Sequence, residues 1–249
     1  MRKYLRAPLY AAAVAMVTTQ YAARGARELK RRLQLRITPG VRHGVLPPYG
    51  DGLGIVLIPP FITRREIMVP IMEHWLQLFG YEVEHPNIPV QTECPWTTCT
   101  KKILPCIKEL YERTGRRVVL VGWSKGGYEA AWLANKHPRY IAMAVTIASP
   151  QVCAYPIAGV GLHTVTCGRI RQCAFPKVAT RLPRGTRIVN IVPTKDRLVP
   201  PKHGAIEGNE HVHRIEDAGH LSVVFKPRLY EILAIELETC LEDEAARAI

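Results

Sequence analysis

The chain has no internal repeat, no glycine- or serine-rich tract and no apolar run long enough for a membrane span. Hydrophobic residues make up 47% of the sequence, and together with the missing low-complexity tracts this argues against extensive disorder. A bilayer crossing needs about 20 apolar residues, whereas the run at residues 7–17 has eleven. With 249 residues, we expect one α/β domain of ordinary size.

Paired Cys-x-x-Cys spacing is also missing, so the cysteines do not indicate a zinc site. The seven cysteines cannot all pair internally, because their number is odd. Free thiols in a reducing compartment are the favoured interpretation, and one or two disulfides in an exported protein are the alternative. The cysteines fall into two groups and one single residue: Cys94, Cys99 and Cys106, then Cys153, Cys167 and Cys173, and finally Cys240.

Acidic residues are nearly missing from the first fifty positions. Residues 1–50 hold ten Lys or Arg against the single acid Glu28, which accounts for +9 of the net charge of +13. No RNA- or DNA-binding motif accompanies this charge, so nucleic acid is the least favoured partner, after anionic lipid and plain solvation. We expect a basic helical segment that contacts an anionic membrane surface or packs on the protein's own core.

The same segment bears on localisation. A basic start followed by an apolar run is the usual form of a signal peptide, but no clean small-x-small cleavage site follows. We therefore favour a cytoplasmic or peripheral-membrane protein, with an exported protein as the alternative.

Beyond residue 50, strand and helix patterns alternate. Continuous apolar runs predict buried strands, and apolar residues at helical spacing predict helices. This alternation predicts a mostly parallel sheet. The predicted strands cover 54–59, 80–84, 118–121, 141–147, 187–192 and 212–215, and the predicted helices cover 65–79, 98–114, 128–137 and 227–244. Residues 151–185 break the alternation, and we interpret them as a lid or as an ordinary long connection.

A Gly-x-Ser-x-Gly motif stands between the strand at 118–121 and the helix at 128–137. The tight turn would project the hydroxyl of Ser124 clear of the sheet, while Gly122 and Gly126 leave room for close backbone packing. Ser124 is therefore the candidate nucleophile, and a structural turn in an inactive relative is the alternative.

Asp196 and His220 each follow a predicted strand, so both are expected at the carboxyl edge of the sheet with Ser124. A serine hydroxyl is a poor nucleophile until a base removes its proton, which assigns His220 as general base. Asp196 would orient the imidazole and stabilise its protonated form. Taken alone, His220 would be a surface histidine and Asp196 a turn residue, but the order and placement of all three favour catalysis.

These stretches resemble the α/β-hydrolase family, and most closely its bacterial lipases and lipase-like esterases. The likeness spans residues 53–241 and rests on Gly122-Trp123-Ser124-Lys125-Gly126-Gly127, Lys195-Asp196-Arg197-Leu198-Val199-Pro200 and Ala218-Gly219-His220, in the family's order of Ser, Asp and His. The resemblance implies an α/β-hydrolase fold over residues 51–249, with a mostly parallel central sheet and helices on both faces.

The resemblance also implies an oxyanion hole made of two backbone N–H groups, from Lys125 and from the loop near Phe61. Many lipases have His-Gly before the second donor, whereas this chain has Pro59-Pro60, and Pro60 has no N–H. Phe61 is then the expected second donor. We expect the Lys125 side chain to attract an anionic substrate or to reach solvent.

Three functions remain in consideration. The first is a serine esterase or lipase acting on a carboxylic ester with an apolar acyl part. The second is acyl transfer or thioester hydrolysis through the same acyl-enzyme. The third is a non-catalytic protein of the same fold that binds a lipid or a partner. No metal or organic cofactor is expected, because the mechanism requires none. The sequence leaves the oligomeric state open.

Overall fold

The computed structural model describes residues 50–61, 70–77, 79–88, 93–151, 156–157, 160–161 and 182–247. The basic segment predicted over residues 1–50 lies outside these ranges except for Gly50, and so does most of the segment 151–185. The predictions for both segments therefore stay predictions.

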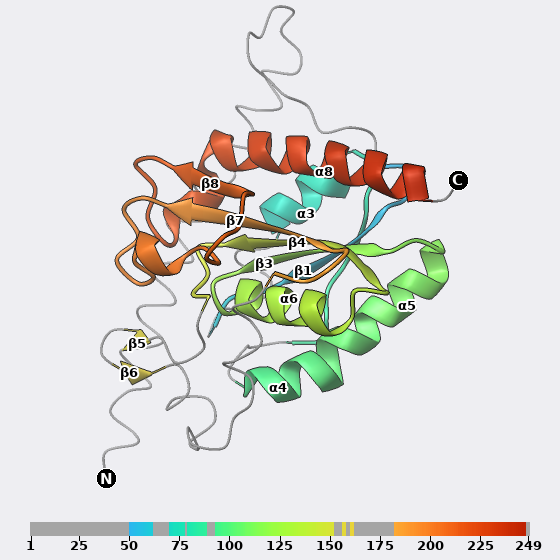
Figure 1. Cartoon of the computed structure of the whole chain (residues 1–249), viewed down its shortest axis with the longest axis horizontal. Helices are drawn as coiled ribbons and strands as arrows, with labels where there is room; N and C mark the ends of the chain where they lie inside the picture. Colours follow the sequence, from blue (N-terminus) through green and yellow to red (C-terminus); the bar gives the residue numbers. More distant parts are fainter. Residues whose placement is uncertain are drawn as a thin grey trace, which may run out of the picture.

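Six parallel strands form the central sheet, in the order β2-β1-β3-β4-β7-β8 (Figure 1). They are β1 (Gly54–Ile58), β2 (Glu82–Glu84), β3 (Val118–Trp123), β4 (Ile141–Ile147), β7 (Arg187–Pro193) and β8 (Val212–Ile215). All six predicted strands are confirmed, as is their parallel arrangement. Two short strands, β5 (Pro156–Ile157) and β6 (Val160–Gly161), pair antiparallel in a separate sheet.

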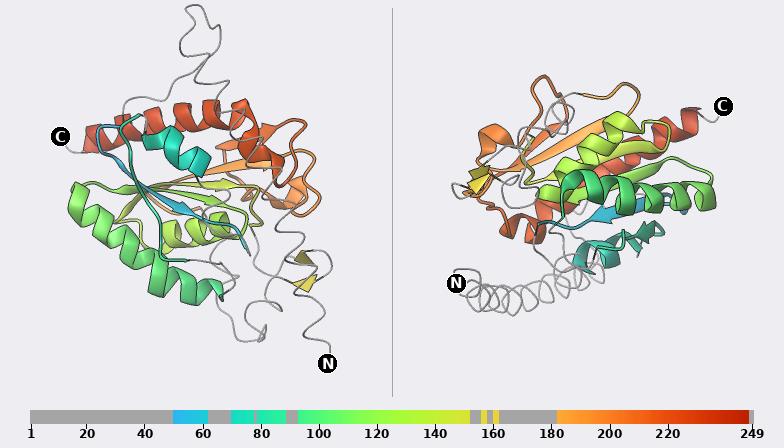
Figure 2. Two further views of the ribbon diagram at one scale, coloured as in Figure 1. Left: turned by 180° about the vertical axis from the view of Figure 1, so that it is seen from behind. Right: turned by 90° about the horizontal axis from the view of Figure 1, so that it is seen from below.

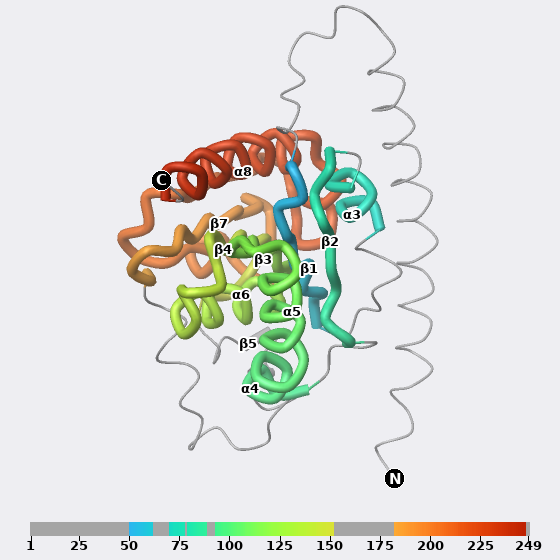
Figure 3. The backbone as a smooth tube through the Cα atoms, turned by 90° about the vertical axis from the view of Figure 1, so that its right-hand side faces the viewer, coloured from blue at the N-terminus to red at the C-terminus, as the bar shows by residue number. Residues whose placement is uncertain are grey.

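Helices cover both faces of the sheet, as predicted (Figure 2 and Figure 3). One face carries α3 (Pro70–Gln77) and the long α8 (Pro227–Arg247). The other face carries α4 (Pro95–Thr98), a π-helical turn η1 (Cys99–Ile103), α5 (Leu104–Thr114) and α6 (Lys125–Lys136).

Alternate residues of each strand build the two cores. In β1, Ile55 and Leu57 face α3 and α8, whereas Val56 and Ile58 face the helices of the opposite layer. Every residue of β1, β3 and β4 is buried, so these strands read as continuous apolar runs in the sequence. The crossover helices that parallel strands require exclude water from both sides.

The helix boundaries differ from the predicted ones. The helix predicted over 98–114 begins at Pro95, which occupies the first turn, where its missing N–H costs nothing. It ends at Gly115, whose left-handed φ of 66° favours glycine. The helix predicted over 128–137 begins at Lys125, because the pair Gly126-Gly127 reads as a turn in the sequence but continues the helix here.

Two more differences concern the ends of the predicted helices and the loops. Of the helix predicted over 65–79, the structure describes Pro70–Gln77 as helical and Phe79 as part of a turn, and α8 extends past the predicted residue 244 to Arg247. The 3₁₀ turns η4 (Pro201–His203) and η5 (Ser222–Phe225) were not predicted. Within the described part of the chain, no helix combines the length and the apolar character needed to span a bilayer.

Candidate functional site

The carboxyl ends of β3, β7 and β8 bring three polar side chains together. The Nε2 atom of His220 lies 3.0 Å from the Oγ atom of Ser124. Its Nδ1 atom lies 2.7 Å from the Oδ2 atom of Asp196. Ser124, His220 and Asp196, here called the Ser-His-Asp cluster, thus form one hydrogen-bonded chain, although the three residues lie far apart in the sequence.

Ser124 stands at a sharp turn between β3 and α6. Its φ of 53° and ψ of −119° are a conformation that side-chain-bearing residues rarely adopt, and such strain costs about 1–3 kcal/mol. Backbone hydrogen bonds hold the turn: the Ser124 N–H donates to the Ile147 carbonyl at 2.8 Å, and the Gly127 N–H donates to the Ser124 carbonyl at 3.1 Å. The strained turn aims the hydroxyl away from the sheet and toward His220.

Three glycines make this turn sterically feasible. A Cβ atom on Gly122 would lie 2.2 Å from the Gly126 carbonyl oxygen, and one on Gly126 would lie 2.4 Å from the Ile58 carbonyl oxygen. A Cβ atom on Gly127 would lie 1.9 Å from the Oγ atom of Ser149. The two backbone contacts cannot give way without moving a strand, so the first turn of α6 packs against β1 and β3 only because these side chains are missing.

Asp196 is held rigidly in the loop after β7. Its side chain is fully buried. The Oδ1 atom accepts hydrogen bonds from the N–H groups of Leu198 and Val199, each at 2.8 Å. This leaves Oδ2 for His220. Because Oδ1 is held by two backbone donors, the direction in which Oδ2 faces the imidazole is fixed.

His220 lies in the loop after β8, which is tied to the Asp196 loop. The Lys195 N–H donates to the Ala218 carbonyl at 2.8 Å, and the Thr194 N–H donates to the Ile215 carbonyl at 3.0 Å. The indole Nε1 of Trp123 donates to the backbone carbonyl of His220 at 3.1 Å. These contacts come from the segment after β7 and from the end of β3, and they fix the loop that carries the imidazole.

The arrangement also selects a tautomer. A hydrogen on Nδ1 satisfies the carboxylate of Asp196 and leaves the lone pair of Nε2 facing the hydroxyl of Ser124. In that form the imidazole is able to accept the serine proton, and the negative carboxylate stabilises the cation that results.

The two predicted oxyanion donors follow neighbouring strands of the sheet. Lys125 is the first residue of α6, so its N–H is one of the four that have no acceptor within the helix. Phe61 is half-buried and follows Pro59 and Pro60 at the end of β1. The Pro59 carbonyl oxygen would lie 2.7 Å from a Cβ on Gly126, so this loop contacts the first turn of α6. The donor roles of Lys125 and Phe61 stay predictions.

The prediction for the side chain of Lys125 is wrong. It neither reaches solvent nor faces a substrate, because it is fully buried, with its Nζ atom 2.8 Å from the Oε1 atom of an equally buried Glu129. A long basic side chain beside a candidate nucleophile suggests substrate contact in the sequence, but here the helix turns it into the core.

A small apolar pocket lies at the same edge of the sheet. Residues from the ends of β1, β3 and β4 line it together with Met72 of α3 and Val224 of η5. Trp123 forms part of its wall, directly before the serine. Among the described residues its lining is entirely apolar, which suits a hydrocarbon group better than a charged one.

No protein-family model and no curated protein sequence matches the chain. Solved structures resemble it in fold at low sequence identity. An α/β-hydrolase from Penicillium sp. sh18 is 13% identical, with 80% of this chain and 93% of that chain covered and a TM-score of 0.61. A lipase from Bacillus licheniformis is 15% identical, with coverage of 78% and 96% and a TM-score of 0.59. A monoacylglycerol lipase from Paleococcus ferrophilus is 14% identical, with coverage of 78% and 96% and a TM-score of 0.57.

The chain has the α/β-hydrolase fold. This confirms the fold class that the three motifs predicted. The match covers most of both chains, so the fold assignment applies to the domain as a whole rather than to the serine turn alone.

A larger cavity lies between the end of β2 and α5. Its lining is mainly polar and charged, with Glu84, Lys101, Lys102 and Arg113 among the residues, and it contains no member of the Ser-His-Asp cluster. Charged side chains of the lining form ion pairs: Arg113 contacts Glu84 at 2.7 Å, and Lys102 contacts Glu93 at 2.6 Å. No group of His, Cys, Asp or Glu side chains suited to a metal ion occurs among the described residues.

The structure describes four cysteines, Cys94, Cys99, Cys106 and Cys240, and shows no disulfide bond among them. Burial and the nearby Glu84 and Glu109 raise the pKa of Cys106 to about 12. Burial and Glu244 raise that of Cys240 to about 12 as well. At neutral pH both thiols are therefore protonated and unreactive.

Two contacts of the site were not predicted from the sequence. The bond from Trp123 to His220 spans 97 positions, and no local pattern signals it. The Lys125–Glu129 ion pair has the i,i+4 spacing typical of helix pairs, so its formation was readable from the sequence. Its burial was not, because burial depends on contacts between residues far apart in the sequence, such as that of Cys99 with the Glu129 carbonyl oxygen.

Proposed function

We propose that this α/β-hydrolase cleaves carboxylic esters that have an apolar acyl part, through an acyl-enzyme on Ser124. The observation that carries the proposal is the hydrogen-bonded chain from the Ser124 hydroxyl through His220 to the buried carboxylate of Asp196. A serine, a base and an orienting acid in this order are what acyl transfer to a hydroxyl requires.

In the proposed reaction, Nε2 of His220 removes the proton of Ser124 as Oγ attacks the ester carbonyl carbon. The resulting imidazolium is stabilised by Asp196, and it then gives its proton to the leaving alcohol as the C–O bond breaks. A water molecule attacks the acyl-enzyme by the same route in reverse. The serine is released together with a carboxylic acid.

The developing oxyanion needs donors that are already in place. The N–H groups of Lys125 and Phe61 are proposed for this role, because both start from strand ends that flank the nucleophile. Because Lys125 is the first residue of α6, the positive end of the helix dipole would also stabilise the negative charge on the oxyanion.

The apolar lining beside Trp123 favours an apolar group next to the reacting carbonyl, although the pocket, at ≈ 20 Å³, has no room for an acyl chain. Two of the structures with the same fold are described as lipases, one of them as a monoacylglycerol lipase. These similarities favour lipid-like esters, and a series of p-nitrophenyl esters of rising chain length would determine the preferred length.

The first prediction is that Ser124→Ala abolishes ester turnover in a folded protein. We expect a loss of about 10³-fold or more, because the covalent step is gone and only residual transition-state binding remains. Turnover of p-nitrophenyl esters and labelling by a fluorophosphonate probe, followed by peptide mapping, measure the two consequences. The wild type should label at Ser124, and the variant should not label at all.

Asp196→Asn and His220→Ala test whether these two residues and Ser124 act as one catalytic unit. Each should remove most activity, and adding Ser124→Ala to either should cost little more, because members of one catalytic unit are strongly non-additive. A Ser124→Ala protein that keeps more than about a tenth of the activity, or losses that simply multiply, would refute the proposed roles.

A further inference from the structure

The first turn of α6 must hold a backbone N–H donor in place, but its sequence has a low helix propensity. It carries the N–H of Lys125, and its next two residues are Gly126 and Gly127. Close packing demands both glycines, since a Cβ at either position would overlap neighbouring atoms. Yet glycine is the poorest helix former apart from proline, because it retains the most backbone freedom in the unfolded chain. The turn is thus deprived of intrinsic stiffness at the place where a donor must be held still.

A buried ion pair spans this glycine turn. Lys125 and Glu129 flank residues 126–128, and both side chains are 0% exposed. The Nζ atom of Lys125 lies 2.8 Å from the Oε1 atom of Glu129. Cys99 of η1 lies beside the pair, with its Sγ atom 4.0 Å from the Glu129 carbonyl oxygen. Both ends of the side-chain bridge are therefore fixed by packing as well as by charge.

Helix stabilisation does not account for this pair. A lysine in the first turn opposes the helix dipole. In i,i+4 pairs the order with Glu first and Lys second is the more stabilising one, whereas here Lys comes first. Burying both charges adds a desolvation cost that apolar side chains would avoid. A pair that is unfavourable in position, order and burial points to a role other than stability.

We infer that Lys125 and Glu129 are positioning residues, and that their side chains brace the glycine turn so that the Lys125 N–H stays aimed at the oxyanion. The inference rests on the proposed function, since it assigns a support to a donor of that reaction. The brace acts by tethering one end of the turn to the other. Neither side chain touches the substrate.

The test compares two double variants that remove both charges of the pair together. Lys125→Met with Glu129→Leu removes the tether. Lys125→Gln with Glu129→Gln keeps a neutral side-chain hydrogen bond across the turn. An exposed ion pair on α8 supplies the matched control, as Arg228→Gln with Glu231→Gln, because its 3.1 Å contact lies away from the turn.

For Lys125→Met with Glu129→Leu we expect kcat to fall about tenfold or more with KM within about twofold, as for an interaction made in the transition state. Affinity for a trifluoromethyl ketone, which forms a tetrahedral adduct, should fall in parallel. The acid limb of the pH–rate profile should not move, because His220 and Asp196 are untouched. Lys125→Gln with Glu129→Gln should retain at least about a third of the wild-type kcat, and the α8 control should retain all of it.

A folded Lys125→Met/Glu129→Leu protein with wild-type kcat would overturn the inference. So would an equal loss in the Gln/Gln variant, because charge rather than tethering would then be responsible. If the Met/Leu variant does not fold, hydrogen exchange of the wild type decides. The brace predicts that amides of residues 122–128 exchange only with the core of α6, and exchange at loop-like rates would refute it. A wild type without esterase activity would instead refute the proposed function, and the exchange result would still stand.

Discussion

Trp123 joins the serine turn to the histidine loop. Its ring is 5% exposed and forms part of the apolar pocket, and its indole N–H donates to the carbonyl of His220. The ring centroids of Trp123 and His220 are 6.1 Å apart. One side chain thus shapes the proposed acyl site and supports the loop that carries the proposed base.

Trp123→Phe should separate these two tasks, because it keeps an aromatic ring and removes the donor. A lost hydrogen bond and a smaller ring should lower the free energy of unfolding by about 1–2 kcal/mol. A His220 loop without this support should also lower kcat by about three- to tenfold, because small misplacements of a base are costly. Chemical denaturation and steady-state kinetics on a soluble ester measure the two effects.

Trp96→Phe is the matched control, since Trp96 is 52% exposed at the start of α4. It should change stability by less than about 0.5 kcal/mol and leave kcat unchanged. A Trp123→Phe protein that loses stability but keeps the wild-type kcat would show that the hydrogen bond does not position His220.

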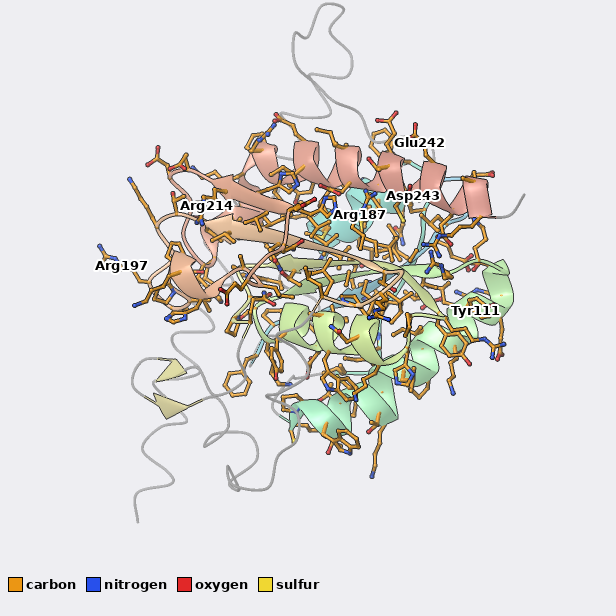
Figure 4. The ribbon with its side chains drawn as sticks, viewed as in Figure 1. Tyr111, Arg187, Arg197, Arg214, Glu242 and Asp243 are labelled. Atoms are coloured by element: carbon orange, nitrogen blue, oxygen red, sulfur yellow. The ribbon has the colours of Figure 1, made fainter. Side chains whose placement is uncertain are left out.

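Helix α8 is bound to the sheet by charged groups as well as by its apolar face. Glu236 is buried, and its carboxylate lies 2.6 Å from Nε2 of His213 on β8 and 3.6 Å from a guanidinium nitrogen of Arg187 on β7. Arg187 also reaches Asp243 at 2.7 Å (Figure 4). Burial alone would raise the pKa of Glu236, but the hydrogen bond from His213 and the charges of His213, His211 and Arg187 lower it below its ordinary value.

A depressed carboxyl pKa has a defined consequence for stability. Its contribution is fully present above the unfolded-state pKa of about 4.3 and is lost as the pH falls through the lower folded-state value. Glu236→Gln cannot ionise, so its free energy of unfolding should decline less steeply below about pH 5 than that of the wild type. Urea denaturation at a series of pH values measures the slopes.

Glu242→Gln serves as the control on the same helix, because Glu242 is exposed. Its slope should match that of the wild type. Equal slopes for Glu236→Gln and the wild type would mean that the buried carboxylate contributes no pH-dependent stability.

Some elements of the fold could be predicted from the sequence and others could not. The four central strands β1, β3, β4 and β7 were predictable because burial on both faces leaves mainly apolar runs, as in residues 118–121. The start of α6 was not, since Gly126-Gly127 signals a turn unless the close contacts with β1 are known. Ser124, Asp196 and His220 could be proposed from strand ends alone. Their supports could not, because Trp123 meets His220 only after β3 and β8 have joined one sheet.

At the scale of the whole molecule, charge is concentrated outside the described domain. Residues 1–50 carry +9 of the net charge of +13, because their ten Lys and Arg residues face a single acid, Glu28. This segment is proposed to hold the enzyme on an anionic membrane surface, where each basic residue contributes about 1 kcal/mol. The full-length chain should sediment with phosphatidylserine-containing vesicles at low salt and be released at high salt.

Replacing Lys30, Arg31 and Arg32 with Gln should reduce vesicle binding by about 10²-fold and leave turnover of a soluble ester unchanged. The control removes the same charge from the domain surface, by replacing the exposed Arg197, Lys202 and Arg214 with Gln. If both triple variants bind vesicles equally, the basic segment is not the membrane contact.

The order of the site residues along the chain governs when the site can exist during synthesis. Ser124 is made 96 residues before His220, and α8, which covers one face of the sheet, follows His220. A growing chain therefore carries its nucleophile for a long interval without the group that would take its proton. Such unfinished chains expose strand edges and apolar faces to their surroundings, but they have no means of attacking esters there. Under the proposed mechanism, ester hydrolysis requires that β8, the last parallel strand, has joined the sheet, so the onset of activity would report the assembly of that strand.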